Sequence, residues 1–134
     1  RDRMDKARMG LVGGSNMLGY LATTVAYREG QPWLDEMLDY VCTNRDVLAD
    51  YVNNQLPGVQ MKKPEGTYLA WLDFSELNLP CKPGQFMLEK ARVAMNEGEM
   101  FGRGGQGHTR LNFGCPRSVL LESLERMKKA LASL

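Results

Sequence analysis

Apolar residues recur with helical spacing in several stretches of the chain. Within residues 17–28, Leu18, Leu21 and Val25 are three or four positions apart, as on one face of a helix. A longer stretch has its apolar positions four or seven apart: Trp33, Met37, Val41, Leu48, Val52 and Leu56. The last stretch has the same periodicity: Leu120, Leu124, Met127, Leu131 and Leu134. These spacings predict three amphipathic helices, each with one apolar face.

The residues around these stretches predict where the helices begin and end. Residues 1–8 are charged and are expected to form the exposed end of a helix, and the glycine-rich residues that follow predict a loop. Ser15 or Asn16 is placed to cap the helix that starts at Met17. Pro57 and Gly58 end the long helix, and Ser118 is expected to cap the last one.

Strand patterns lie between the long helix and the last one. Residues 67–73 are rich in β-branched and aromatic side chains, and in residues 109–113 less polar and polar side chains alternate. Shorter strands are predicted at residues 59–61 and 93–96, with a helix at residues 85–92. The order from residue 17 is helix, helix, strand, strand, helix, strand, strand, helix. It predicts an α/β fold with a small, mostly antiparallel sheet and helices on one side.

The strand at residues 109–113 holds the densest chemistry. Arg110 and Asn112 share one face, between a glycine-rich segment and the turn at Gly114. The guanidinium of an arginine offers paired donors that match a carboxylate or a phosphate. The pattern alone allows two interpretations of this strand. Its polar face either binds an anion or is simply solvated, and Asn112 either orients Arg110 or has no role.

Three stretches resemble a known family. They are residues 13–19 (GGSNMLG), residues 63–73 (KPEGTYLAWLD) and residues 110–117 (RLNFGCPR). In order and spacing they are similar to the fold-type I pyridoxal-phosphate (PLP) enzymes, the aminotransferase class I/II family. The similarity is greatest to the cystathionine β-lyase-like C–S lyase branch. It runs over essentially the whole chain but covers only the C-terminal part of such an enzyme, because the family's cofactor-bearing lysine motif has no match here.

The resemblance implies a domain organisation and a set of partners. Residues 1–30 would be the end of the large, PLP-binding domain, and residues 31–134 would be the small C-terminal domain. The start of the chain, without an initiating methionine, suits a fragment of a longer protein. The complete enzyme would be a homodimer that contains the missing N-terminal large domain and binds PLP and an amino-acid substrate.

The resemblance also implies roles for particular residues. Arg110 would pair with the substrate's α-carboxylate, with Asn112 beside it. Ser15 and Asn16 match a segment near the cofactor and the dimer interface. In the lyase branch a β-thiolate leaves the substrate, whereas in the aminotransferase branch the amino group is kept; the overall similarity favours the C–S lyase. The chain has no predicted catalytic residue of its own.

The glycine-rich segment before the strand has two readings. Gly102 to Gly107 lacks the lysine and hydroxyl ending of a P-loop and precedes a strand, which disfavours a phosphate cradle. It resembles the family's Asn-Pro-Gly loop before a Phe-Gly pair, with Glu97 in place of proline, and this departure is expected to loosen the loop. His108, the chain's one histidine, either touches the substrate as a near neighbour of Arg110 or is a surface residue on a strand edge, and the second interpretation is favoured. It has no second histidine with which to form a metal site.

Composition and charge narrow the classes of function and partner that remain. The net charge is +1, so no general attraction to nucleic acid or an anionic membrane is expected, and no apolar run has membrane-spanning length. Three scattered cysteines disfavour a disulfide framework or a zinc site and fit a reducing cytoplasm. Every lysine lies in a charged or loop setting that would not lower an amine pKa for Schiff-base chemistry. The chain alone is therefore predicted not to hold PLP covalently and to be inactive.

A second hypothesis assigns the chain to a different class of protein. The chain can be a stand-alone, non-catalytic α/β module that binds a ligand or a partner. That hypothesis predicts that residues 1–30 pack on the rest of a closed domain with a polar surface. The enzyme-fragment hypothesis instead predicts apolar surface on residues 9–28, left bare by missing partners or covered by another copy.

Overall fold

The structure is a computed structural model that describes residues 2–8 and 16–134. The chain divides into two compact units, Arg1–Met37 and Leu38–Leu134, and each is described by itself. The predicted boundary between residues 30 and 31 concerns the domains of a longer enzyme and stays a prediction.

The first unit is helical. It contains α1 (Asp2–Arg8), α2 (Met17–Glu29) and the start of α3 (Gln31–Gln55). Asn16 caps α2, because its side-chain oxygen accepts a hydrogen bond of 2.6 Å from the backbone N–H of Gly19. This confirms the capping prediction for Asn16, whereas Ser15 lies outside the described residues. Neither α1 nor α2 contains a buried residue.

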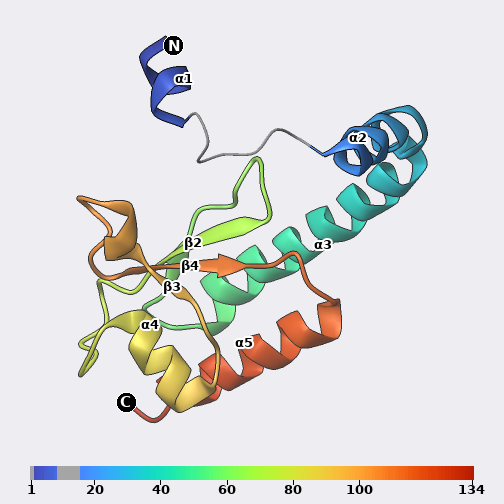
Figure 1. Cartoon of the computed structure of the whole chain (residues 1–134). Helices are drawn as coiled ribbons and strands as arrows, with labels where there is room; N and C mark the ends of the chain where they lie inside the picture. The colour runs from blue at the N-terminus through green and yellow to red at the C-terminus, as the bar shows by residue number, and fades with distance from the viewer. Residues whose placement is uncertain (1, 9–15) are drawn as a thin grey trace. The chain divides into compact units, whose positions relative to one another are not determined.

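The second unit is built on an antiparallel sheet (Figure 1). Its strands are β1 (Gln60–Met61), β2 (Leu69–Asp73), β3 (Asn96–Glu97) and β4 (His108–Asn112), in the order β1-β2-β4-β3. Helices complete the fold: the rest of α3, α4 (Pro83–Phe86), the π-helical turn η1 (Met87–Ala91), the 3-10 turn η2 (Gly98–Phe101) and α5 (Arg117–Leu131). The predicted α/β class with an antiparallel sheet and flanking helices is confirmed.

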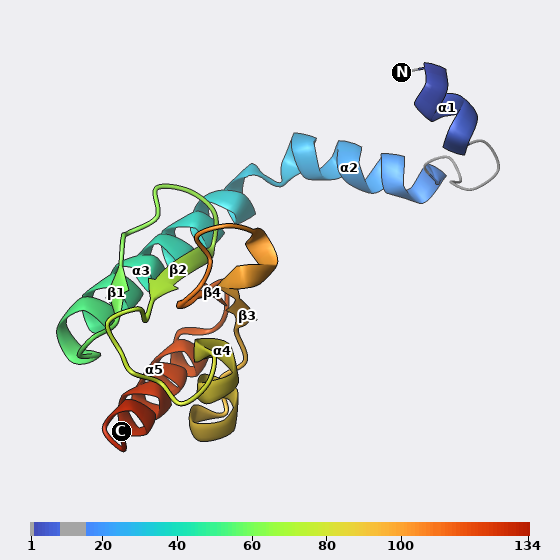
Figure 2. The same ribbon diagram turned by 90° about the vertical axis from the view of Figure 1, so that its left-hand side faces the viewer.

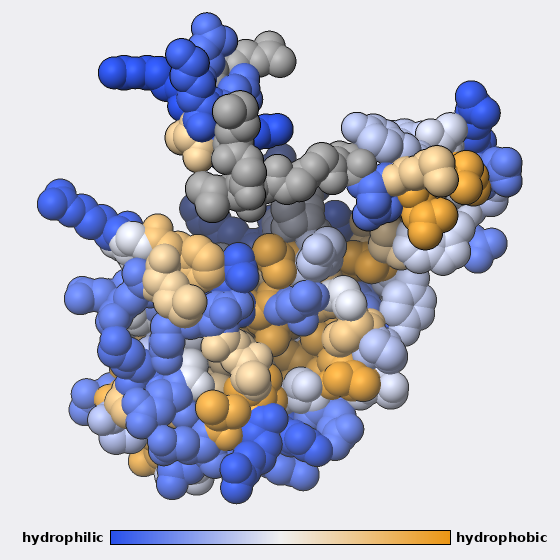
Figure 3. Space-filling model, in the orientation of Figure 1, coloured by the Kyte–Doolittle hydropathy of each residue, from blue (hydrophilic) through white to orange (hydrophobic). Residues whose placement is uncertain are grey.

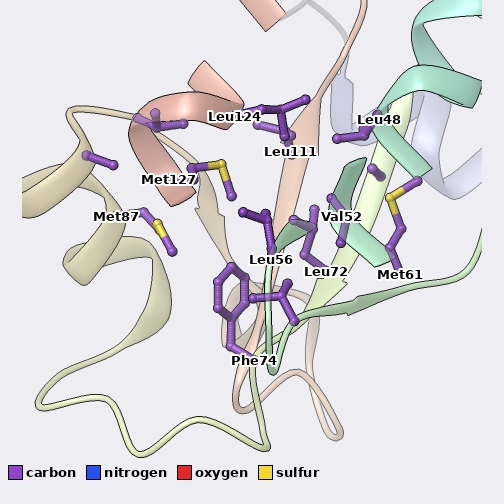
Figure 4. Packing of buried hydrophobic residues seen from close by; sticks show 14 of the residues in the cluster. Leu48, Val52, Leu56, Met61, Leu72, Phe74, Met87, Leu111, Leu124 and Met127 are labelled. Atoms are coloured by element: carbon purple, nitrogen blue, oxygen red, sulfur yellow. The ribbon is translucent and has the colours of Figure 1, made fainter. Parts of the chain in front are cut away.

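One face of the sheet forms the core. Burial alternates along the central strands, so that Leu72 of β2 and Leu111 of β4 point to the same side. That side meets α3 and α5, which run beside the sheet in two views (Figures 1 and 2). Leu48 and Leu124 are fully buried there, and Figure 4 shows them with the side chains that surround them. Each such leucine contributes about 1.5–3 kcal/mol by leaving water.

Several predicted boundaries were wrong. The short strand expected at residues 93–96 is β3 at Asn96–Glu97, and the helix expected at residues 85–92 begins at Pro83 and ends as the π-turn η1. Ser118 does not cap α5, because the helix already begins at Arg117 with Pro116 at the capping position. The first free N–H of α5, that of Arg117, instead donates to the hydroxyl of Tyr40 at 2.7 Å. A helix start satisfied from another element needs no local cap.

Within residues 2–8 and 16–134, no helix combines the length and apolarity required to cross a membrane.

Candidate functional site

The face of the sheet opposite the core holds Arg110 at its centre. In the antiparallel register, Arg110 lies opposite Trp71 of β2 on one side and opposite Asn96 of β3 on the other. Its neighbours along β4, Thr109 and Leu111, point into the core, so Arg110 must point outward. The side chain is half-buried. The strands paired on both sides of β4 therefore fix the position of the Arg110 backbone, from which the charged side chain projects.

The Arg110 guanidinium is held by two neighbours. One terminal amine, Nη2, donates a hydrogen bond of 3.0 Å to the side-chain oxygen of Asn96. The ring of Phe101 lies against its flat face, with 4.5 Å between Cζ and the ring centroid. The Nε–H is buried and meets no acceptor among the described residues. An orphaned buried donor of this kind costs about 1–3 kcal/mol, so an acceptor supplied by water or a ligand would stabilise it.

Aromatic rings surround this arginine. Trp71 contacts Phe101 edge to face, with ring centroids 5.6 Å apart and planes at 76°. It also stacks on His108 at the same centroid distance, 5.6 Å, with planes only 22° apart. Trp71 packs on these rings, although 38% of it remains exposed. The rings form a partly apolar wall beside the cation.

His108 joins this wall to a charged group. Its Nδ1 lies 2.7 Å from the carbonyl oxygen of Gln106, so Nδ1 carries the proton and donates. Its Nε2 lies 3.5 Å from a carboxylate oxygen of Asp73 and forms an ion pair only when the ring is protonated. Hydrogen bonds from Ser75 hold the pKa of Asp73 below its usual range, and a charged His108 lowers that pKa further. His108 thus lies at the start of β4, an interior strand of the sheet rather than an edge strand, and has its own partners.

The groove next to these residues does not include Arg110. It has a volume of about 480 Å³ and is lined by Trp71, Asp73, His108, Lys62 and neighbouring residues of β1 and α3. Arg110 lies one step further along the same face of β4 than His108. Two residues along a strand span roughly 6.6 Å, so the arginine is adjacent to the groove rather than inside it.

Asn112 has a different partner from the one considered in the sequence. Its side-chain oxygen accepts a hydrogen bond of 2.8 Å from the backbone N–H of Gly114 and so shapes the turn that ends β4. The residue that accepts a hydrogen bond from Arg110 is Asn96, and the ring of Phe101 covers the face of the Arg110 guanidinium. Sequence reasoning missed both. The available indication was that Asn96 ends a predicted strand, which an antiparallel sheet can place opposite Arg110.

Arg117 has a structural role at the start of α5. Its Nε donates to the side-chain oxygen of the buried Asn44 at 3.1 Å, and its guanidinium lies over the ring of Tyr40 with 5.0 Å between Cζ and the centroid. These contacts anchor the start of α5. The positions of Ser15 and Asn16 relative to Arg110 are not described, because residues 9–15 lie outside the described part and Asn16 belongs to the other unit.

The glycine-rich segment packs closely on itself. A side chain added at Gly105 would overlap the carbonyl oxygen of Gly98, so these two backbones touch. The expectation that Glu97 loosens this loop was wrong. Its carboxylate accepts a hydrogen bond of 2.8 Å from the backbone N–H of Gln85 and ties β3 to the start of α4. The carboxylate supplies the helix N-terminus with the acceptor that it lacks.

None of the seven lysines has an amine shielded from solvent. They are Lys6, Lys62, Lys63, Lys82, Lys90, Lys128 and Lys129, and all are exposed. Lys63 pairs with Asp46 at 2.7 Å, and Lys128 donates to Gln55 at 2.9 Å. The described residues therefore do not fit a covalent hold on PLP. They do fit a carboxylate, through Arg110.

A small antiparallel sheet backed by helices thus carries a forked cation, Arg110, on its outer face. No protein-family model matches the chain. The cystathionine β-lyase PatB of Bacillus subtilis is 38% identical over 138 residues, which cover 98% of this chain and 36% of PatB. The crystal structure of OvoB superposes with a TM-score of 0.88 at 45% identity and covers 100% of this chain and 34% of OvoB.

A second solved structure is also similar to this chain. Cystalysin from Treponema denticola, whose crystal contains a pyridoxal 5'-phosphate cofactor, has a TM-score of 0.87 and 34% identity over 96% of this chain and 33% of its own. The chain spans about a third of the length of the curated relatives it matches. In sequence and fold it corresponds to the C-terminal part of a fold-type I PLP enzyme, in the cystathionine β-lyase and aminotransferase group.

Proposed function

We propose that this chain is the substrate-carboxylate-binding end of a PLP-dependent enzyme that acts on an amino acid. The observation that carries the proposal is the half-buried Arg110, fixed by paired strands and holding an unsatisfied Nε–H. The names of its relatives support the reaction class, since they include cystathionine β-lyases and aminotransferases.

In this proposal, Arg110 binds the substrate's α-carboxylate and orients the amino acid. A bidentate ion pair with the α-carboxylate fixes one end of the amino acid and so limits the direction of its Cα–H bond. Lysine would supply the charge without the fork. When bound, PLP supplies an electron sink for the bonds at Cα. The residues that would hold it covalently are not in this chain, and Ser15 and Asn16 are proposed to lie near it.

Between the two reactions, we propose the C–S β-lyase. Arg110 serves lyase and aminotransferase equally, because both bind the same α-carboxylate. The preference rests on the relatives: PatB is 38% identical, whereas the aspartate aminotransferase of Pyrococcus horikoshii is 28% identical.

The first unit supports the enzyme fragment over the stand-alone module. No residue of α1 or α2 is buried, and apolar side chains are exposed on α2, where Figure 3 shows them at the surface. These side chains are Met17, Leu18, Tyr20, Leu21, Val25 and Tyr27. We propose that they are covered by the large domain, to which residues 1–30 would belong, in a cytoplasmic homodimer. The chain alone would then be inactive.

The test replaces Arg110 in the full-length protein that contains this chain. Arg110→Ala should raise KM for the amino acid by about 10- to 150-fold, as expected for the loss of a charged hydrogen-bond pair, while the coenzyme's absorbance is kept. Arg110→Lys should recover only part of this loss. Arg126→Ala is the matched control, because Arg126 pairs with Glu122 on the exposed surface of α5. An Arg110→Ala variant with unchanged KM and kcat would refute the proposal.

A further inference from the structure

The side chain of Asn96 decides how Arg110 presents its donors. The two residues occupy directly paired positions of β3 and β4, and such pairs have Cβ atoms about 4.5–5.5 Å apart. The Asn96 oxygen accepts one hydrogen bond from Nη2 of Arg110 at 3.0 Å. Because the Nε–H meets no acceptor, this is the polar contact that fixes the plane of the guanidinium among the described residues.

Phe101 restrains the same group in a second direction. Its ring lies 4.5 Å from Cζ of Arg110, and Trp71 packs against the ring from the side. An aromatic face opposes tilting of the guanidinium, while the hydrogen bond that Arg110 donates to Asn96 opposes rotation within the plane. Together they order a long side chain before any substrate binds, which removes an entropic cost from binding.

From this geometry we infer that Asn96 is a positioning residue for substrate carboxylate capture, and the inference rests on the proposed function of Arg110. A neutral amide is the suitable group for this task. It accepts one hydrogen bond yet leaves the positive charge of Arg110 uncompensated for an incoming carboxylate. An aspartate at the same place would accept the same bond but would also pair with the cation and compete with the substrate.

This difference gives a test that separates positioning from simple structural support. The full-length, PLP-loaded protein is titrated with L-alanine and with ethylamine, which lacks the carboxylate, and the Kd of each is followed by the coenzyme's absorbance. The ratio of the two Kd values measures what the carboxylate contributes. The variants are Asn96→Ala, Asn96→Asp and Arg110→Ala. Asn78→Asp is the control. Asn78 is exposed, and its substitution adds the same negative charge at a position away from Arg110.

Arg110→Ala should abolish most of the preference for L-alanine. Asn96→Ala should lower the preference about five-fold, the equivalent of one hydrogen bond, and Asn96→Asp should lower it further, while Asn78→Asp matches the unmodified protein. If Asn96→Asp keeps the preference better than Asn96→Ala, or if neither changes it while Arg110→Ala does, the inference is wrong and the function of Arg110 stands. If Arg110→Ala leaves the preference intact, both the proposed function and the inference fall.

Discussion

The buried side chain of Asn44 accepts a hydrogen bond from Nε of Arg117 at 3.1 Å. The same amide donates to the carbonyl oxygens of Phe113 at 3.1 Å and of Cys115 at 2.8 Å. One side chain on α3 thus satisfies the chain just beyond β4 and the first residue of α5. It fixes the exit of the strand that carries Arg110.

We predict that Asn44→Leu destabilises the protein by about 2–3 kcal/mol, because carbonyl oxygens of Phe113 and Cys115 would be left buried without a donor. Urea unfolding measures this as a lower midpoint with an unchanged slope. The control is Asn54→Leu, since Asn54 is exposed and its one side-chain partner among the described residues is Asp50 on the same helix; it should cost less than about 0.5 kcal/mol. Equal losses in the two variants would contradict the role given to Asn44.

The long helix shows what the sequence can predict. Its apolar spacing correctly identified Leu48, Val52 and Leu56 as buried, because burial follows the period of the helix. The same period places Asn44 on the stripe, three residues after Val41 and four before Leu48. A polar residue in that position indicates a buried hydrogen-bond partner, yet its partners lie about 70 residues away and no local pattern names them.

The Arg110 site shows what the sequence could not predict. The fork of Arg110 and its outward face were predictable from strand alternation. Its partners were not, because they depend on the register between β3 and β4 and on the path of η2. A shift of one residue in that register would turn Asn96 to the other face of the sheet. Side-chain chemistry is thus readable locally, whereas the pairing that gives it a function is a property of the folded sheet.

Gly105 should not tolerate a side chain. A Cβ there would overlap the carbonyl oxygen of Gly98, and backbone cannot move aside as a flexible side chain can. We expect Gly105→Ala to cost about 1–3 kcal/mol and to displace the turn that carries Phe101. Gly66→Ala is the matched control, because nothing lies within 4 Å of a Cβ at that position. Thermal unfolding compares the two, and an equally mild effect of Gly105→Ala would mean that the close approach is absent in solution.

The stability of the fold should depend on Asp46 in acid. Hydrogen bonds from Arg45 and Lys63 lower the pKa of the Asp46 carboxyl from 3.8 to about 2. A pKa lowered by folding stabilises the folded state fully above the unfolded value of 3.8, and this contribution is lost as the pH falls to about 2. Asp46→Asn should therefore flatten the dependence of the unfolding free energy on pH between these values. Titration of the Asp46 carboxyl by NMR gives an independent check, and an ordinary pKa near 3.8 would contradict the pairing.

The lysines lead to the last prediction, on covalent cofactor attachment. All seven are exposed, so none lies in the desolvated, apolar surroundings that activate an amine for Schiff-base chemistry. After incubation of the 134-residue chain with an equimolar amount of PLP and reduction with borohydride, mass spectrometry should find no stoichiometric adduct on any single lysine. The full-length protein, treated in parallel, should carry one adduct on a peptide outside this chain. A complete adduct on one of these seven lysines would show that the chain holds the cofactor itself, and the division of labour proposed here, with carboxylate binding on this part and cofactor attachment on another, would have to be abandoned.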